Sequence, residues 1–580
     1  MPSEIQIART ERVDDIPLLL EQMERMKIAS LLDEHFPTHG NWQGASLGQV
    51  VIVWLAYILS EGDHRLNSVR GWVAGLLMTL KLCLNRSELD ELDVTDDRLA
   101  LILTRLGDDR AWEGYEVAQN GRLILAYSLE NICVRVDSTT AKSYVDVSEE
   151  GLFQFGHSKE RRSDLPQLKI NQSVLDPLGI PLTTTIVSGN TADDPLYVPE
   201  IKKVQASLQR SGVLYVGDCK MSALATRAYI AAHQDYYLSP LSAVQMPADK
   251  LKTLLEPVWD KTQPLTPIYR PVTSVKEKSE QMGYGFVTVI TQTRNEEGQV
   301  LEWQEQQLIV HSFKHAKAQE QALKERLKKA EQAIAALNPR GRGRKKLDEA
   351  ATREAVDEIL ARYQVNGLLT LVYENDTQVK SKRAYGQRPA ETICTTTVKV
   401  QSSRDATAYT NHVRHLGWRV LVCNHLKLSL TEAVLAYREE YLVERGFNRL
   451  RGKLLGITPF FLSSTTRIKG LIRLLSLGLR VLCLVEFEVR QRLKDNEEKL
   501  DGIYAGNPKR ATAKPTTEMM LKAFRGLTIT VVHVDGHESY HTTPLNPVQT
   551  RILTLLDFPL TLYQSLAQQS EKPVVKMGEP

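Results

Sequence analysis

The fold of the whole chain is interpreted from the stretch Tyr437-Arg-Glu-Glu-Tyr-Leu-Val-Glu444-Arg-Gly-Phe-Asn-Arg-Leu-Arg451. Just before it, Ser429-Leu-Thr-Glu432 has the spacing of a capping box, so we expect one helix to begin near residue 429. Tyr437, Glu444 and Arg451 are spaced by seven residues, which places them on one face of such a helix. That face carries a carboxylate between a phenol and a guanidinium.

An isolated helical glutamate usually belongs to a solvated, charged face. Here the acid has apolar neighbours, so the face is not simply solvated. These neighbours are Leu442, Val443, Phe447 and Leu450.

Two aspartates far upstream each follow an apolar run that is typical of a strand. Asp137 follows Ile132-Cys-Val-Arg-Val136, and Asp218 comes just after Val213-Leu-Tyr-Val216. An aspartate at the end of a strand is often only a turn or cap residue. Three carboxylates that converge can instead hold Mg²⁺, which prefers hard oxygen ligands and keeps several waters. Asp137, Asp218 and Glu444 are therefore our candidate catalytic residues and metal ligands.

Two such ions about 4 Å apart can activate an attacking oxygen and stabilise the leaving one. We expect Mg²⁺ as the cofactor, with Mn²⁺ as a substitute.

Length and composition permit many functions. A chain of 580 residues is too long for one core, so we expect about three or four domains. Lys plus Arg total 73 and Asp plus Glu total 70, which gives a net charge of +3. Global charge therefore does not indicate a nucleic-acid partner, and that inference depends on local clusters.

Cysteine usage and hydropathy predict a cytoplasmic protein without a membrane partner. The six cysteines are dispersed without a Cys-x-x-Cys pair, which argues against a zinc site or a disulfide framework. The first residues include acids and lack a long apolar stretch, unlike a signal peptide. The most apolar segment, 471–493, contains charged residues, among them Arg473, Arg480, Glu486 and Glu488, so we expect a buried or partner-packed helix and a candidate dimerisation element.

Periodicity divides the chain into five segments. Residues 1–128 predict a helical N-terminal domain for DNA-end binding, dimerisation or capping of the next domain. Residues 129–240 alternate strands and helices as in a mixed sheet with helices on its faces. Residues 241–410 predict a β-rich insertion with a long helical pair. Residues 411–495 carry the Glu444 helix, and 496–580 predict a hairpin around Asp535-Gly536 and a polar tail.

Two basic segments are candidate DNA-binding sites. The first is a loop with Lys159, Arg161 and Arg162, which either contacts phosphates or is a solvated turn. The second, Arg340-Gly-Arg-Gly-Arg-Lys-Lys346, places five positive charges in seven residues. It either follows the DNA backbone or is a flexible linker between helices. Its candidate residues are Arg340, Arg342, Arg344, Lys345 and Lys346.

Other cofactors are disfavoured. His533, His537 and His541 are spaced by four, but they fall on a strand and a tight turn rather than on a helix, so we reject a zinc site. The sequence contains no glycine-rich phosphate loop, so it does not predict ATP binding.

Several of these motifs together carry a family resemblance. They are Gly156-His-Ser-Lys-Glu-Arg-Arg-Ser-Asp-Leu-Pro-Gln-Leu168, Gly189-Asn-Thr-Ala-Asp193, Tyr215-Val-Gly-Asp218 with Met221-Ser222, and the Glu444 helix. In combination they resemble the DDE transposases of bacterial insertion sequences, in the insertion-sequence-four superfamily. The match runs from about 130 to 490, and the N-terminal helices look like the leader domain of one branch.

The resemblance implies a ribonuclease-H-like α/β catalytic domain with a β-rich insertion before its last acid. It implies a transposase that cleaves the ends of an insertion sequence and transfers the 3′ ends to target DNA. Its partners would be double-stranded DNA of the element ends and the target, and a second copy of the chain on that DNA. Tyr437 would position DNA near the cut, and Arg451 would hold a phosphate.

Two departures from the family signature matter. Glu440 stands where the superfamily usually has arginine, so the DNA contact of that position does not transfer. Either Arg438 takes it over or this branch does not use it. Arg451 stands where lysine is usual and can bind phosphate with a different geometry.

Two alternatives remain open on the sequence. One is a ribonuclease-H-like nuclease without strand transfer. The other is a catalytically inactive DNA-binding relative, although all three acids are intact.

Overall fold

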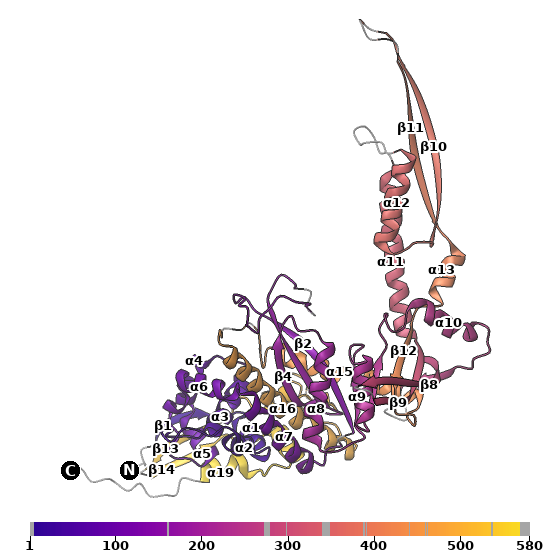
Figure 1. Ribbon diagram of the computed structural model, residues 1–580. Helices are drawn as coiled ribbons and strands as arrows, with labels where there is room; N and C mark the ends of the chain where they lie inside the picture. Colours follow the sequence, from indigo (N-terminus) through magenta and orange to yellow (C-terminus); the bar gives the residue numbers. More distant parts are fainter. Residues whose placement is uncertain are drawn as a thin grey trace. The chain divides into compact units, whose positions relative to one another are not determined.

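The computed structural model describes residues 5–130, 132–158, 162–271, 279–296, 299–338, 348–384, 386, 389, 391–439, 441–458, 460, 462–507, 509–534 and 537–568. The protein is a mixed α/β protein with two compact units (Figure 1). Unit 1 comprises Met1–Ser239, Thr293–Leu301 and Leu435–Pro580. Unit 2 comprises Pro240–Gln292 and Glu302–Val434. Each unit is described by itself below.

A mixed sheet in unit 1 carries the candidate acids. Its strands run in the order β4-β3-β2-β5-β6, with β2 antiparallel to β3 and parallel to β5. Their bounds are β2 (Cys133–Lys142), β3 (Gln167–Leu175), β4 (Ile180–Ser188), β5 (Leu214–Gly217) and β6 (Tyr236–Pro240). Every residue of β3 is buried. The predicted mixed sheet is confirmed.

Helices pack on this sheet and on one another. They are α1 (Ile16–Arg25), α2 (Ile28–His35), α3 (Leu47–Glu61), α4 (Leu66–Gly75), α5 (Leu77–Leu84), α6 (Asp96–Leu106), α7 (Asp109–Ala126), α8 (Tyr197–Leu208), α9 (Leu224–Ala232), α15 (Tyr441–Arg451) and α16 (Thr465–Asp495). Two short 3₁₀ turns, η1 (Glu91–Val94) and η2 (Asp194–Leu196), precede α6 and α8. None of the helices in the described ranges combines the length and the apolar run needed to cross a bilayer.

The helix α16 lies at the centre of unit 1. It packs against α3, α6, α15 and strand β4, and most of its side chains between Ile468 and Leu493 are buried. Arg480 is fully buried: its guanidinium donates to Gln119 and pairs with Glu116 at 3.3 Å. The prediction that 471–493 is a dimerisation element is therefore wrong, because the chain's own elements cover this surface.

A second, three-stranded sheet joins distant parts of unit 1. β1 (Ile5–Arg12) pairs antiparallel with β13 (Thr528–Val534), which pairs in turn with β14 (His537–Thr542). The short helix α19 (Thr561–Gln568) packs on β14, whereas α17 (Thr517–Ala523) and α18 (Pro547–Leu555) pack against α16. β13 and β14 pair as the two strands of the predicted C-terminal hairpin, and its turn residues, Asp535 and Gly536, lie outside the described residues. The segment 1–128, expected to be helical, also contains a strand, because β13 offers β1 an edge.

Unit 2 contains strands in the order β12-β9-β8-β7 and a separate two-stranded ribbon, β10-β11. The bounds are β7 (Thr266–Tyr269), β8 (Gln281–Glu296), β9 (Gln299–Ser312), β10 (Leu369–Lys382), β11 (Glu391–Arg404) and β12 (Trp418–Cys423). Its helices are α10 (Ala248–Trp259), α11 (Phe313–Leu337), α12 (Glu349–Tyr363) and α13 (Ala406–Val413). One apolar core lies between α11, α12 and β11, and another lies between α10 and strands β8, β9 and β12. A β-rich region with a helical pair was expected here.

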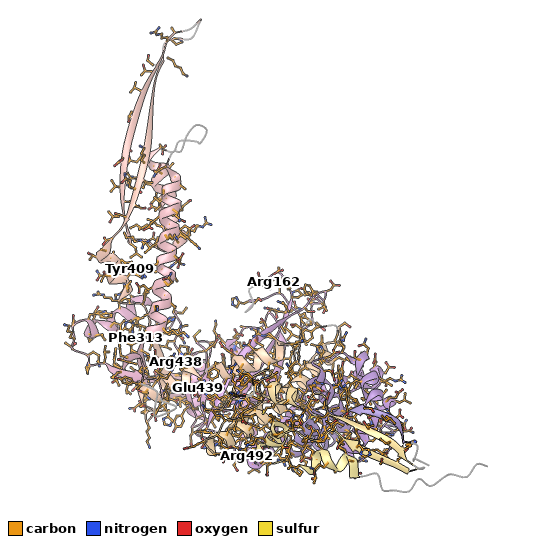
Figure 2. The ribbon with its side chains drawn as sticks, turned by 180° about the vertical axis from the view of Figure 1, so that it is seen from behind. Arg162, Phe313, Tyr409, Arg438, Glu439 and Arg492 are labelled. Carbon is orange, nitrogen blue, oxygen red and sulfur yellow. The ribbon has the colours of Figure 1, made fainter. Side chains whose placement is uncertain are left out.

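The predicted single helix from 429 to 451 is two helices. The capping box forms, because Ser429 Oγ donates to Glu432 Oε2 at 2.6 Å and accepts from the Glu432 amide at 3.3 Å. However, α14 (Leu430–Arg438) ends before α15 begins at Tyr441. At the break the buried Arg135 guanidinium donates to the Ala436 carbonyl at 2.7 Å, in competition with the helical hydrogen bond of that carbonyl. Figure 2 labels Arg438 and Glu439 at this point.

This break corrects the prediction of one functional stripe. Tyr437 belongs to α14, whereas Glu444 and Arg451 belong to α15. The heptad spacing therefore does not place the three side chains on one face.

Candidate functional site

Strands β2 and β5 bring Asp137 and Asp218 to neighbouring positions. The strands are parallel and pair residue by residue up to Val136 with Gly217, and each aspartate is the next residue on its strand. Paired residues of adjacent parallel strands lie about 5 Å apart and project to the same face. Both aspartates are half-buried. The prediction that Asp218 directly follows a strand is confirmed, but the prediction that Asp137 ends its strand is wrong: β2 continues to Lys142, because β3 pairs with it along that length.

Two hydrogen-bond donors orient Asp218. The hydroxyl of Tyr197, on α8, donates to Asp218 Oδ1 at 2.6 Å, and the Lys220 amide donates to the same oxygen at 2.8 Å. Burial raises the pKa of Tyr197 well above its usual value, and the negative charges of Asp218, Asp137 and Asp193 raise it further. The phenol therefore remains a proton donor at neutral pH, and three carboxylates lie within its electrostatic reach.

The third of these acids, Asp193, accepts hydrogen bonds from two other side chains, Lys169 and Ser138. Lys169, a buried lysine on β3, donates to Asp193 Oδ1 at 2.6 Å and to the Thr191 carbonyl at 2.5 Å. Ser138 Oγ donates to Asp193 Oδ1 at 3.2 Å, next to Asp137. These contacts hold the 189–193 loop against the strand that carries the first candidate acid.

Glycines let this loop pack closely. A Cβ on Gly189 would lie 1.8 Å from the Gln167 carbonyl oxygen, and one on Gly156 would lie 2.3 Å from the Gly189 carbonyl oxygen. Only glycine permits both approaches. Two of the sequence motifs quoted above therefore pack together beside Gln167, where β3 begins.

Glu444 lies on α15, which packs against β2. The helix begins at the turn between β3 and β4, where Gly179 faces the Leu442 carbonyl, 3.3 Å from an added Cβ. Five residues of α15 are buried, whereas Glu444 is exposed. The helix thus runs along the strand of Asp137 and presents its acid to solvent.

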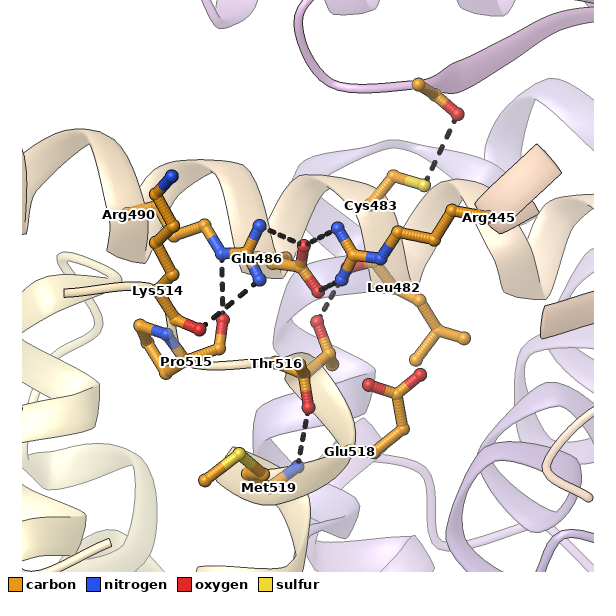
Figure 3. Close-up of polar contacts among 12 residues, drawn as sticks. Arg445, Leu482, Cys483, Glu486, Arg490, Lys514, Pro515, Thr516, Glu518 and Met519 are labelled. Atoms are coloured by element: carbon orange, nitrogen blue, oxygen red, sulfur yellow. Dashed lines mark hydrogen bonds and ion pairs between the residues drawn. The ribbon is translucent and has the colours of Figure 1, made fainter. Parts of the chain in front are cut away.

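Two arginines on the same helix fix α15 to α16. Arg445 donates to the buried carboxylate of Glu486, which also pairs with Arg490 at 2.7 Å (Figure 3). Arg449 donates to the same carboxylate. Arg449 makes a second, bidentate contact with Glu518 at 2.9 and 3.0 Å. The basic residues of this helix other than Arg451 are therefore structural.

The metal-ligand set is the least complete part of the site. Among the described residues, no three His, Cys, Asp or Glu side chains are grouped closely enough to hold one metal ion. The pair of Asp137 and Asp218 fits Mg²⁺ by itself, because this ion is commonly held by one or two carboxylates together with waters and substrate phosphates. The role of Glu444 as a third ligand stays a prediction.

The predicted DNA-binding residues fall into three groups. Lys159, Arg161 and the segment 340–346 lie outside the described residues. Arg162, labelled in Figure 2, forms a bidentate pair with Asp164 at 2.8 Å for both bonds, on the exposed surface. Tyr437 is half-buried on α14, and Arg451 donates to the Phe447 carbonyl at 3.4 Å.

Sequence reasoning missed Tyr197 and Lys169 as site residues. Asp193 had a signal, because it closes the Gly189-Asn-Thr-Ala-Asp193 motif. Tyr197 had none: it lies 21 residues before its partner Asp218 and stands in an ordinary helical segment.

Comparisons with known proteins give few matches for this chain. No protein-family model matches the sequence, and no curated protein is similar enough to count as a match. Among solved structures, the chain is similar to a piggyBac transposase, seen in a cryo-EM synaptic complex with hairpin DNA. The identity is 7% and the TM-score is 0.35, over 97% of this chain and 83% of that chain. A likeness this distant supports no conclusion about the fold or the activity of this protein.

Proposed function

We propose that this chain is a DDE-type transposase with a ribonuclease-H-like catalytic domain in unit 1. The observation that carries the proposal is the side-by-side placement of Asp137, within strand β2, and Asp218, directly after the parallel strand β5. An antiparallel β2-β3-β4 meander beside these parallel strands, with α15 packed on β2, supports the same assignment. The motif resemblance in the sequence favours transposition over other uses of paired carboxylates.

Asp137 and Asp218 would hold Mg²⁺, or Mn²⁺ as a substitute, and Glu444 would complete the set when DNA is bound. Bound metal would supply Lewis-acid stabilisation of the charge that develops on phosphodiester oxygens. Tyr197 keeps Asp218 in place through its hydrogen bond to Oδ1. Lys169 keeps the 189–193 loop closed against β2 through Asp193.

The overall reaction has two parts. Water hydrolyses a phosphodiester at the end of an insertion sequence and frees a 3′-hydroxyl. That hydroxyl then attacks a phosphodiester of the target DNA, which joins the element to the target and releases a target 3′-hydroxyl. No side chain forms a covalent intermediate. DNA would contact Lys159, Arg161, Arg162, Tyr437, Arg451 and the 340–346 segment. Two copies of the chain would act together on the paired ends of the element.

Substitution of the first aspartate tests the proposal. We expect Asp137→Asn to reduce Mg²⁺-dependent cleavage of an element-end duplex by at least ~10³-fold, because a neutral amide is a poor ligand for a hard cation. Binding of the same duplex should change little. Cleavage is measured on a labelled duplex in denaturing gels, and binding is measured by fluorescence anisotropy.

The matched control is Asp146→Asn, an exposed aspartate in the loop after β2. It should cleave like the wild type. Cleavage by Asp137→Asn at the wild-type rate would remove the carboxylate pair from the mechanism. Supplying pre-cut ends with a free 3′-hydroxyl separates the activities, because a transposase joins them to target DNA and a simple nuclease does not.

A further inference from the structure

A cluster of positively charged and titratable side chains lies on unit 2, where α10, α11 and α13 come together. Lys252 comes from α10, Arg326 from α11, His412 from α13, and Arg414 and His415 from the turn after α13. We call these five residues the basic face. Lys252, His412 and Arg414 are exposed, and Arg326 and His415 are half-buried.

Packing contacts hold these three elements together. On α13, Tyr409 (labelled in Figure 2) donates to Glu320 on α11 at 3.0 Å, and the Gly417 amide donates to Gln319 at 2.7 Å. Trp259 at the end of α10 contacts the His415 ring edge-on, with centroids 5.6 Å apart. The basic face is therefore carried by a fixed scaffold, and Figure 1 shows α10 and α13 beside the same end of α11.

The cations of the basic face are not neutralised by acids. Within the described ranges, Lys252, Arg326 and Arg414 form no ion pair: Arg326 donates to the neutral amide of Gln364 at 2.9 Å, and Arg414 lies over the Trp259 ring at 5.3 Å. By contrast, Arg404 and Arg353, elsewhere in unit 2, pair with Glu331 at 2.6 Å and with Glu349 at 2.8 Å. The sequence itself has no Asp or Glu from 406 to 431.

Like charges on this surface repel one another. Partial desolvation lowers the pKa of His412, and the positive charges of Arg326, His415 and Lys252 lower it further, with no acid opposing them. A surface with such uncompensated potential is stabilised by an anion that spans several elements at once. The net charge of the whole chain is only +3, so this concentration of positive charge is local.

We propose that the basic face binds the phosphate backbone of double-stranded DNA. This contact deepens the proposed function, on which it rests, and it uses residues other than those of the segments 159–162 and 340–346. A duplex carries one negative charge per ~1.7 Å of its axis, so one duplex presents phosphates to cations on three neighbouring elements. The Arg414 guanidinium, held over an aromatic ring, is pre-oriented for bidentate contact with a phosphate.

Removing two charges tests the basic face in the full-length protein. Lys252→Gln combined with Arg414→Gln should weaken binding of any duplex roughly 10- to 100-fold at about 0.1 M salt, irrespective of sequence. The slope of log affinity against log salt should fall by about 2, because each lost phosphate contact contributes about 0.9. Anisotropy of a labelled duplex over a series of salt concentrations measures both quantities.

The matched control is Lys328→Gln on α11, an exposed lysine about half a helical turn around from Arg326. It should leave the affinity and the salt slope unchanged. Thermal unfolding of the double variant, which removes exposed side chains, should match the wild type.

A second measurement does not depend on a variant. With saturating duplex, acetylation of Lys252 by an amine-reactive ester should slow by about tenfold or more, whereas acetylation of Lys328 should not, as read by mass spectrometry. The basic face is rejected if the double variant keeps the wild-type salt slope or if Lys252 is not protected, and the cleavage tests of Asp137 then stand independently. If the wild-type chain binds no duplex at low salt, both the basic face and the proposed function are rejected.

Discussion

At the scale of single residues, the site depends on how Asp218 is held. Tyr197 and the Lys220 amide both donate to Oδ1, so within the described ranges Oδ2 receives no hydrogen bond. The carboxylate thus turns one oxygen toward the protein and keeps the other for a different partner. Tyr197 acts through Asp218 and is a positioning residue.

Tyr197→Phe should weaken Mn²⁺ binding about 10- to 100-fold, because the hydrogen bond that orients Asp218 is lost while the ring remains. The spin-resonance signal of free Mn²⁺ during titration measures the affinity without any DNA. Tyr215→Phe is the control, since its buried hydroxyl on β5 has no hydrogen-bond partner among the described residues. Equal affinities for the wild type and Tyr197→Phe would exclude the positioning role.

The sequence could predict Asp137 and Asp218 but not the environment of either. Each aspartate follows an apolar run that forms a strand by local preference, and parallel strands bring their ends to one edge. Tyr197 and Lys169 reach the site through tertiary packing alone, and nothing in their local sequence records that contact. Whether Glu444 joins the aspartates depends on the position of a helix, which a local pattern does not specify.

At the scale of elements, the start of α14 could be predicted from local sequence, whereas the break between α14 and α15 could not. The capping box at Ser429 was predicted correctly, because it depends only on residues three apart. The break after Arg438 depends on Arg135, which lies some 300 residues earlier and donates to a carbonyl inside the helical ladder. Arg135 is held there by a bidentate pair with Asp176 at 2.8 and 2.6 Å.

The attachment of α15 to α16 is concentrated in one carboxylate. Glu486 is buried and accepts from Arg445, Arg449 and Arg490. Glu486→Gln keeps the shape of this side chain but leaves the guanidiniums of Arg445 and Arg490 without a counter-charge, whereas Arg449 keeps Glu518. We expect the free energy of unfolding to fall by about 3–5 kcal/mol, measured by urea denaturation.

An exposed pair provides the control for this change. Glu498 pairs with Arg551 at the surface, so Glu498→Gln should cost less than about 1 kcal/mol. Similar small losses for both variants would mean that Glu486 does not hold α15 in place.

At the scale of the whole molecule, the β1-β13 pairing joins regions that the sequence presented as separate domains. Thr10 lies directly opposite Thr530, and their hydroxyl oxygens are 3.2 Å apart. Periodicity found the hairpin at 528–542 because its strands are neighbours in sequence, but it missed β1. A strand that completes a remote edge has only a weak signal of its own.

A designed disulfide tests this register. Thr10→Cys with Thr530→Cys should form a disulfide under mild oxidation and stabilise the protein by about 2–4 kcal/mol, because it constrains the unfolded chain. Mass spectrometry of the linked peptides identifies the bond, and thermal unfolding with and without reductant measures the gain. Thr10→Cys with Thr528→Cys is two positions out of register and should not cross-link. Preferential linkage of that second pair would contradict the observed strand pairing.

The same pairing has a consequence for biosynthesis. At a typical rate of about 5–20 residues per second, a ribosome needs roughly half a minute or more to pass from β1 to β13. Throughout that interval β1 has been synthesised but cannot form its hydrogen bonds with β13. The three-stranded sheet of unit 1 therefore closes only after the ribosome has passed β14, and a translation product that ends before β13 cannot acquire it.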